Sequence, residues 1–333
     1  MFNNKSILIT GGTGSFGKEF VRTIALKYKP KKLIIFSRDE LKQFEMEQIF
    51  SLEEFPFIRY FIGDVRDAKR VLEASEGVDY LVHAAALKQV PAAEYNPFEA
   101  IKTNVIGAQN IIEAAIKNKI HKVIALSTDK AAAPTNLYGA TKLCSDKLFI
   151  AANNFNGDHQ IKFSVVRYGN VMGSRGSVIP YFIKMKEKNI FPITDERMTR
   201  FNITINEGVD FVIKCFDLMW GGELFIPKMP SYRINDIADA IDEKCPKKII
   251  GIRPGEKLHE ELFTISDSQR VIDFQDYFVL LPSFAPLWSI DDFINKSYKI
   301  KGKTITDEVS YDSGSNVRFL TVKEIKKLIE KVQ

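Results

Sequence analysis

Residues 6–17 read Ser-Ile-Leu-Ile-Thr-Gly-Gly-Thr-Gly-Ser-Phe-Gly, a short apolar run that passes directly into a glycine-rich loop. The run predicts a buried strand, and the residues after the loop predict a helix. Gly11 permits a tight turn, Gly14 lets backbone N–H groups approach a bound group, and Gly17 lets the helix pack close to the strand. Because a helix N-terminus carries a partial positive charge, this unit predicts a site for the pyrophosphate of a dinucleotide.

The alternation of strand and helix continues through the first half of the chain. Buried strands are predicted at residues 6–10, 32–36, 58–62, 80–83, 123–127 and 163–167. Helices are predicted at residues 16–28, 40–50, 68–75, 96–118 and 136–153. The fourth helix should bury one face made of Ile106, Asn110, Ile111, Ala114 and Ala115. This order predicts an α/β fold with a Rossmann-type, doubly wound parallel sheet.

The second half is organised differently, because glycine and proline become frequent after about Asn170 and the predicted elements become shorter. We therefore expect two domains. Residues 1–170 should form an NADP-binding Rossmann domain. Residues 171–333 should form a smaller mixed α/β substrate-binding lobe, with the chain crossing back to the first domain.

Composition narrows the class of protein. The chain has 333 residues, 45% of them apolar and 27% charged, and a formal net charge of +5. The basic residues are scattered, so we expect solvated helix faces and no nucleic-acid partner. No apolar run reaches the ~20 residues of a membrane span, and the N-terminus has no signal-peptide pattern. Cys144, Cys215 and Cys245 lack metal-ligand spacing, so we expect reduced thiols, no metal site and a cytoplasmic protein.

The residues after the second predicted strand, Ser37-Arg38-Asp39, indicate which dinucleotide is bound. Arg38 can pair with a ribose 2′-phosphate and Ser37 can donate to it, which favours NADP. Asp39 could instead accept from a ribose 2′-hydroxyl, so NAD stays open. Asp64-Val65 fits the adenine side, with a helix N-cap as the alternative. The predicted cofactor site consists of Gly11, Thr13, Gly14, Ser15, Phe16, Gly17, Ser37, Arg38, Asp39, Lys42, Asp64, Val65, Ala84, Ala85, Ala86, Tyr138, Lys142 and Asn170.

A second group of residues predicts oxidation of an alcohol. Thr128 ends the fifth strand, and Tyr138 and Lys142 lie one helical turn apart at the start of the next helix. A lysine beside a tyrosine should lower the pKa of the phenol, because the positive charge favours the phenolate. Thr128 can hydrogen-bond the reacting hydroxyl. Together these side chains suit proton removal at oxygen while a hydride leaves carbon.

These residues resemble the extended short-chain dehydrogenase/reductase superfamily. Residues 125–131, Ala-Leu-Ser-Thr-Asp-Lys-Ala, and residues 136–142, Asn-Leu-Tyr-Gly-Ala-Thr-Lys, narrow the resemblance to the inverting UDP-N-acetylglucosamine 4,6-dehydratases that open pseudaminic acid synthesis. Similar blocks run over nearly the whole chain, at residues 37–42, 63–67, 83–88, 167–170, 173–177, 197–200 and 253–257. The resemblance implies UDP-N-acetylglucosamine as substrate and a homo-oligomer, expected to be a hexamer.

The resemblance also assigns the elimination step. A 4-epimerase only removes and returns a hydride, whereas a 4,6-dehydratase must also eliminate water across C-5 and C-6. Lys130 would take the C-5 proton and Asp129 would protonate the leaving 6-hydroxyl. Lys130 must then be neutral, which burial or the nearby Lys142 would favour by lowering its pKa. The alternative is that Asp129 caps a loop beside an exposed Lys130.

The resemblance further implies a substrate site in the second half of the chain. Its predicted residues are Lys88, Lys130, Asn170, Val171, Thr194, Arg197, Arg200, Arg253 and Glu256, with Arg175 as a further phosphate donor. Two residues depart from the family pattern: Asn202 stands where tryptophan is usual, and Ala133 where asparagine is usual. Both abut site blocks, so they leave the fine sugar specificity open.

Three other readings stay open at this point: a nucleotide-sugar 4-epimerase, a retaining 4,6-dehydratase, and a non-catalytic NADP-sensing protein on the same fold. The large retaining dehydratases commonly carry methionine at the position of Tyr138 and have N-terminal membrane spans, which disfavours the second reading. The combination of Tyr138, Lys142, Asp129 and Lys130 has no use in a mere sensor, which disfavours the third.

Overall fold

The computed structural model describes residues 1–155, 160–173, 177–296 and 301–332. Its main sheet contains β1 (Ser6–Thr10), β2 (Lys32–Ser37), β3 (Ile58–Ile62), β4 (Tyr80–His83), β5 (Lys122–Thr128), β6 (Lys162–Tyr168), β10 (Leu224–Pro227), β14 (Val271–Asp273), β15 (Tyr277–Leu280) and β16 (Lys303–Thr304). Smaller sheets contain β7 (Asn170–Val171), β9 (Thr199–Ile203) and β11 (Ser231–Arg233); β8 (Phe191–Ile193) and β12 (Lys247–Ile249); and β13 (Glu261–Phe263) and β17 (Tyr311–Asp312).

The α-helices are α1 (Ser15–Lys27), α2 (Glu40–Glu47), α3 (Ala68–Ala74), α4 (Val90–Tyr95), α5 (Pro97–Ile101), α6 (Gly107–Lys117), α7 (Leu137–Ala151), α8 (Val178–Lys186), α9 (Ile205–Leu218), α10 (Ile234–Asp242), α11 (Ile290–Lys296) and α12 (Val322–Val332). A π-helical segment, η1 (Lys102–Ile106), joins α5 to α6. Short 3₁₀ segments are η2 (Asp129–Ala131), η3 (Ala152–Asn154) and η4 (Ile265–Arg270).

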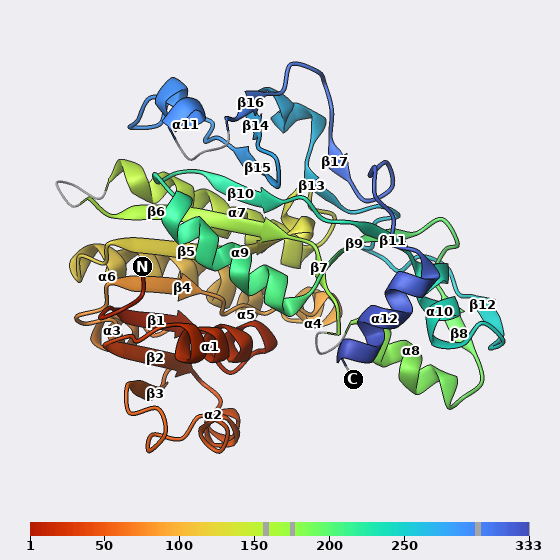
Figure 1. Ribbon diagram of the computed structural model, residues 1–333, viewed down its shortest axis with the longest axis horizontal. Helices are drawn as coiled ribbons and strands as arrows, with labels where there is room; N and C mark the ends of the chain where they lie inside the picture. Colours follow the sequence, from red (N-terminus) through yellow and green to blue (C-terminus); the bar gives the residue numbers. More distant parts are fainter. Residues whose placement is uncertain (156–159, 174–176, 297–300, 333) are drawn as a thin grey trace.

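The main sheet has the order β16-β14-β15-β10-β6-β5-β4-β1-β2-β3 (Figure 1). The strands from β3 to β10 pair in parallel, and β15, β14 and β16 extend the sheet in antiparallel fashion. Within the parallel part the order 3-2-1-4-5-6 is that of a Rossmann fold, so the predicted fold class is confirmed. In such sheets ligands bind at the carboxyl ends of the strands, where the order reverses.

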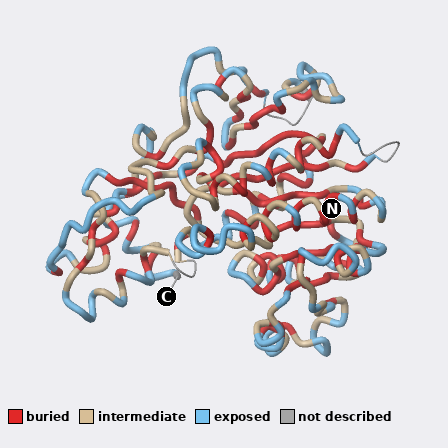
Figure 2. The backbone as a smooth tube through the Cα atoms, turned by 180° about the vertical axis from the view of Figure 1, so that it is seen from behind, coloured by how far each residue is buried: buried red, intermediate tan, exposed pale blue. Residues whose placement is uncertain are grey.

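Apolar burial holds this sheet between two layers of helices. All five residues of β1 are buried, and so are most residues of β2, β5 and β6. Helices α1 and α9 pack together on one face of the sheet, whereas α3, α6 and α7 lie on the other (Figure 1). Figure 2 shows the burial concentrated in the central strands. The continuous apolar runs of the sequence are therefore explained by strands covered on both faces.

The helix predicted over residues 96–118 is confirmed as a continuous helical run over residues 97–117, but the prediction missed a π-helical turn inside it. The chain forms α5, then the π-helical η1, then α6, and the unpredicted α4 precedes them. Asn110, Ile111, Ala114 and Ala115 are buried as predicted, but Ile106 is 48% exposed. Since a π-helical turn closes i→i+5 bonds, it changes which side chains of the preceding turn share the buried face.

The residues after 171 divide between two cores. Strands β10, β14, β15 and β16 join the main sheet. A second, smaller core contains Phe182, Phe191, Tyr232, Ile237 and Ile325 and lies beyond the carboxyl ends of the parallel strands (Figure 1). The predicted boundary at residue 170 stays a prediction.

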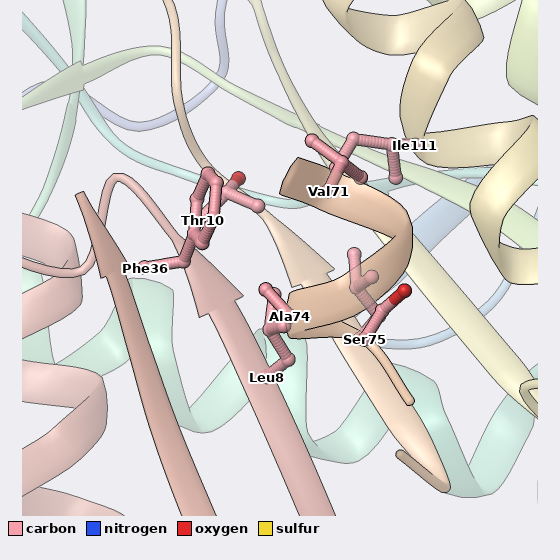
Figure 3. Close-up of a pocket in the computed structure, with 8 residues that line it drawn as sticks. Leu8, Thr10, Phe36, Val71, Ala74, Ser75 and Ile111 are labelled. Carbon is pink, nitrogen blue, oxygen red and sulfur yellow. The ribbon is translucent and has the colours of Figure 1, made fainter. Parts of the chain in front are cut away.

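A small void in the main core is shown in Figure 3, between β1, β2, β4 and α3. It is lined by Leu8, Thr10, Phe36, Val71, Ala74, Ser75, Leu81 and Ile111. The void has no room for a water molecule, so it belongs to the packed core and is no binding site. None of the described helices combines the length and apolar character needed to cross a bilayer.

Candidate active site

One large cavity of about 1170 Å³ lies along the carboxyl ends of the parallel strands. It exceeds the ~300–1,000 Å³ of a typical pocket, as a site for a dinucleotide together with a second ligand would require. Among the predicted site residues, those that line it are Gly11, Thr13, Gly14, Ser15, Phe16, Gly17, Ser37, Arg38, Asp39, Lys42, Asp64, Val65, Ala84, Ala85, Ala86, Lys88, Thr128, Asp129, Lys130, Tyr138, Lys142, Asn170, Val171, Thr194, Arg200, Arg253 and Glu256.

Arg197 is not brought to this cavity. Its side chain is 73% exposed, and its guanidinium donates two hydrogen bonds to Asp195, of 3.0 and 2.8 Å. A bidentate pair with a neighbouring carboxylate already uses the geometry that a phosphate would need. Arg175 lies outside the described residues.

The glycine loop forms one end of the cavity and packs tightly on the first strand. A Cβ atom at Gly17 would lie 2.3 Å from the carbonyl oxygen of Gly12, so only glycine allows this approach of α1. Thr13 Oγ1 lies 2.8 Å from Ser37 Oγ, which ties the loop to the end of β2. The N-terminus of α1 and the end of β2 therefore form one continuous wall.

Arg38 and Asp39, at the end of β2, differ in how closely neighbouring residues engage their charged groups. The Asp39 carboxylate caps α2 by accepting from Lys42 N at 3.0 Å, and it also pairs with Lys42 Nζ. These hydrogen bonds from Lys42 lower the pKa of Asp39. Arg38 is 54% exposed, and its guanidinium makes only a 3.6 Å contact with Asp64. Arg38 is thus the freer of the two groups to meet a ligand.

Asp64 is held by Arg66, which donates to it at 2.7 Å from Nη2 and at 3.0 Å from its backbone N–H. It is not the N-cap of α3, because Asp67 fills that position and accepts from Arg70 N at 3.0 Å. The capping alternative for Asp64 is therefore wrong.

The catalytic candidates meet where β5 ends and α7 begins. Thr128 is the last residue of β5, Asp129 and Lys130 lie in η2, and Tyr138 lies in the first turn of α7. A Cβ atom at Gly139 would lie 2.1 Å from the Lys130 carbonyl oxygen, so glycine lets α7 start directly against η2. The side chains of Tyr138 and Thr128 both line the cavity. The structure brings these four residues together on the wall of one cavity.

The prediction for the Tyr138 phenol was wrong in sign. Burial raises the pKa of Tyr138 to about 12, and the positive charge of Lys130 and the hydrogen bond from Thr128 oppose this only in part. Lys142 is itself buried, and burial lowers the pKa of its ammonium against the opposing charge of Asp146. In the free protein the phenol is therefore neutral.

The prediction of a depressed Lys130 pKa was also wrong. Lys130 Nζ lies 3.1 Å from Asp129 Oδ1 and 3.2 Å from Glu260 Oε1. Burial lowers the pKa of Lys130, but the two carboxylates together raise it further, so the net shift is upward. The alternative of a capping Asp129 beside an exposed Lys130 is wrong too, because Asp129 is 1% exposed and Thr128 is the N-cap of η2.

Glu260 is the site residue that the sequence reasoning missed. It is 2% exposed, lines the cavity, and lies 3.8 Å from Arg200 Nε as well as close to Lys130. It follows the block at residues 253–257 by three positions and directly precedes β13. That proximity to a recognised block was the only signal, since nothing local distinguishes Glu260 from the adjacent Glu261.

The predicted substrate residues come from segments that are far apart in the sequence. Asn170 and Val171 form β7, beside Arg200 on β9, and Arg253 lies 3.8 Å from Glu256 in the loop before β13. Burial lowers the pKa of Lys88. Two buried acceptors, Asn170 Oδ1 and Glu256 Oε2, have no partner among the described residues. Unpartnered buried acceptors in a cavity wall suit a ligand that brings hydroxyl or amide donors.

The two departures from the family pattern are structurally distinct. Asn202 is buried on β9 opposite Asn170 in the β7–β9 pairing. Ala133 adopts a positive φ of 43° in the turn between η2 and α7. That conformation is strained for alanine and is one that asparagine tolerates better.

Comparison with known proteins supports this arrangement. The model of a family described as polysaccharide biosynthesis protein matches residues 7–282. The chain is 53% identical to the UDP-N-acetylglucosamine 4,6-dehydratase (inverting) of Campylobacter jejuni, over 99% of this chain and 98% of that protein. It is 40% identical to the UDP-glucose 4-epimerase of Rickettsia conorii, over 99% and 96%. The solved structure of Pen from Bacillus thuringiensis is 38% identical, covers 100% of both chains and superposes with a TM-score of 0.89.

Proposed function

Because this chain belongs to the polysaccharide biosynthesis protein family, with an extended short-chain dehydrogenase/reductase-type fold, we propose that it is an inverting UDP-N-acetylglucosamine 4,6-dehydratase. The observation that carries the proposal is the contact between Asp129 and Lys130, 3.1 Å apart on the cavity wall that Tyr138 and Thr128 also line. Hydride transfer alone needs only the tyrosine, the lysine of α7 and the threonine. A second acid–base pair is needed only when water is also eliminated.

We infer that the cofactor is NADP. The glycine loop and the N-terminus of α1 would hold its pyrophosphate, and Ser37, Arg38 and Lys42 would hold the 2′-phosphate. The fit is supported by the close packing at Gly17 and by the engagement of Asp39 with Lys42, which leaves a cationic end to β2. When bound, the nicotinamide would supply reversible hydride chemistry, with removal at sugar C-4 and return at C-6, so that no net oxidation would occur.

Tyr138 would receive the proton of the 4-hydroxyl while Thr128 holds that hydroxyl in place. Since burial keeps the phenol neutral in the free protein, forming the phenolate requires positive charge nearby. Lys130 and Lys142 line the same cavity and can provide it. The oxidation at C-4 then makes the C-5 hydrogen acidic, because the new carbonyl stabilises the carbanion.

Lys130 and Asp129 would perform the elimination as a pair that shares one proton. In the free protein this proton is on Lys130; its transfer to Asp129 produces a free amine and a carboxylic acid without changing the net charge. The amine then takes the C-5 proton, and the acid protonates the 6-hydroxyl, which leaves as water. Together with the hydride returned to C-6, reprotonation of C-5 from the opposite face would give UDP-2-acetamido-2,6-dideoxy-β-L-arabino-hex-4-ulose.

The sugar nucleotide itself would be held by the second half of the chain. Arg200 and Arg253 would bind the diphosphate, Glu256 would accept from the uridine ribose, and Lys88 and Asn170 would contact the sugar. The homo-oligomer, its size and the entry of the product into pseudaminic acid synthesis stay predictions of the resemblance.

The proposal is tested by incubating the protein with NADP and UDP-N-acetylglucosamine and analysing the product by mass spectrometry and proton NMR. We expect loss of one water molecule and a new methyl signal from C-6. An intact 6-hydroxyl with a galacto-configured sugar would overturn the proposal and favour a 4-epimerase, the activity named for the Rickettsia relatives. The Lys130→Ala variant should lose dehydration while it still binds NADP.

A further inference from the structure

Glu260 presents a buried carboxylate that the proposed mechanism does not use. Its backbone is fixed on both sides, since Glu260 N donates to Ser313 Oγ at 2.9 Å and Ser313 N donates to Glu260 O at 2.8 Å. Its Oε1 lies 3.2 Å from Lys130 Nζ, and its Oε2 has no partner among the described residues. Asp129 repeats this pattern, with Oδ1 on Lys130 and Oδ2 unpartnered. One ammonium therefore lies between two buried carboxylates.

This arrangement is costly if its only purpose is stability. Removing a carboxylate from water costs several kcal/mol, and the cost is recovered only when its remaining lone pairs are hydrogen-bonded. Here each carboxylate leaves one oxygen unpartnered on or near the cavity wall. Unsatisfied buried polar atoms of this kind are a mark of functional sites more than of structural ion pairs.

We propose that Glu260 is a positioning residue for the elimination step, whose charge keeps the single proton of the Lys130–Asp129 pair within the site and holds Lys130 Nζ beside Asp129. The inference rests on the proposed function. Glu260 acts through Lys130 and itself gains or loses no proton in the step.

The proton balance shows where this charge acts. Before elimination the shared proton moves from Lys130 Nζ to Asp129. The electron pair of the C-5–H bond then forms the C-5–C-6 double bond, Lys130 gains the C-5 proton, and the C-6–O bond breaks as Asp129 protonates the departing oxygen. The step ends with a protonated Lys130 that again contacts Asp129 and Glu260, as Lys130 does in the structure. Glu260 stabilises that end state and opposes loss of the shared proton to solvent.

Other charged and titratable groups also surround the Lys130–Asp129 pair, and they influence how strongly the Glu260 charge holds the shared proton. Arg200 on β9 lies 3.8 Å from Glu260 and, being positive, lowers the pKa of Lys130. Tyr138 on α7 and Tyr232 on β11 interact with Lys130 and are kept neutral because burial raises their pKa. Asp129 and Glu260 are the carboxylates that face Lys130. Removing one of two carboxylates should therefore lower the pH at which the shared proton is lost.

The test compares Glu260→Gln with the matched control Glu261→Gln and with the unmodified holoenzyme. Glu261 is the adjacent carboxylate, lies outside the cavity wall and makes only a 3.9 Å contact with Lys257. In Glu260→Gln the basic limb of the kcat/KM profile should move about 1–3 pH units lower, the shift typical of losing one close charge. The kcat should fall while KM stays within about threefold, since only the elimination loses its support.

A second readout separates elimination from oxidation. With substrate present, Glu260→Gln should accumulate reduced cofactor, seen as a persistent nicotinamide absorbance, because C-4 oxidation continues while elimination is slow. An unshifted basic limb together with wild-type kcat would overturn the inference. Failure of the unmodified protein to dehydrate UDP-N-acetylglucosamine would instead overturn the proposed function, so the two failures are distinguishable.

If Glu260→Gln does not fold, Glu260→Asp replaces it. Aspartate keeps the charge but withdraws it by one methylene group, so we expect a smaller shift of the basic limb in the same direction. A profile that coincides with that of Glu261→Gln would contradict the role of Glu260.

Discussion

Replacing Arg38 with alanine should weaken the binding of NADP and leave that of NAD almost unchanged. Arg38 lines the cavity, is 54% exposed and makes a 3.6 Å contact with Asp64. An exposed ion pair of this kind contributes about 0–1 kcal/mol, so its loss should not disturb the fold. A hydrogen bond to a charged phosphate contributes about 1.5–3 kcal/mol, and exposure favours the lower end. The Kd for NADP should therefore rise about tenfold or somewhat more.

Arg66 offers a matched control. It binds the same Asp64 carboxylate more closely, at 2.7 Å, but does not line the cavity. Isothermal titration of NADPH and NADH into the unmodified protein, Arg38→Ala and Arg66→Ala should show a loss specific to NADPH and to Arg38. If Arg66→Ala weakened NADPH binding equally, Arg38 would act only by holding Asp64. If the unmodified protein bound NADH more tightly, the assignment of NADP would be refuted.

Three further predictions follow from the buried groups. In the native protein the Arg167 guanidinium lies 2.9 Å from the buried Asp146 carboxylate. Arg167→Met removes this ion pair, so the free energy of unfolding measured in urea should fall by about 3–5 kcal/mol. An unchanged urea midpoint would refute this. Gly139→Val places side-chain atoms against the Lys130 carbonyl, so kcat should fall sharply while the Kd for the cofactor changes little. An equally large loss of cofactor affinity would argue for general unfolding. The difference in tyrosinate absorbance between the unmodified protein and Tyr138→Phe reports the ionisation of Tyr138. This difference should titrate near pH 12, because burial raises the pKa of the phenol. A midpoint near 10 would contradict the burial effect.

The strands were predictable because burial on both faces leaves a simple mark in the sequence. Residues 6–10, 58–62 and 80–83 match β1, β3 and β4, and the other three predicted strands differ from theirs by one residue at one or both ends. A strand covered on both faces is apolar at most positions, so its limits are visible in the sequence, whereas β3 at the edge of the sheet is buried only at Ile58. Helix limits carry no comparable mark.

Helix α4 and the π-helical segment η1 could not be predicted, for physical reasons. The π-helical η1 forms from ordinary helix residues, and its i→i+5 bonds depend on how α5 and α6 pack against α7 and the sheet. The helix α4 is six residues long and has proline at its start, which in the sequence suggests a loop.

The candidate active site combines residues that are close together in the sequence with residues that only the fold brings together. The glycine loop and the pair Tyr138–Lys142 are local patterns, and the sequence predicted their placement. Glu260, which raises the pKa of Lys130 together with Asp129, is far away in the sequence and reaches Lys130 because β13 packs beside η2. The sequence places only the adjacent Asp129 beside Lys130, so the second carboxylate could not be foreseen.

The proposed function depends most on Lys130 and Asp129 acting at C-5 and C-6 of a hexose that has been oxidised at C-4. The direct measurement is proton and carbon NMR of the product formed from UDP-N-acetylglucosamine in heavy water. Deuterium at C-5, a methyl group at C-6 and the L-configured 4-keto sugar are predicted. A product that retains its 6-hydroxyl and carries no deuterium at C-5 would contradict the elimination and leave only hydride transfer at C-4.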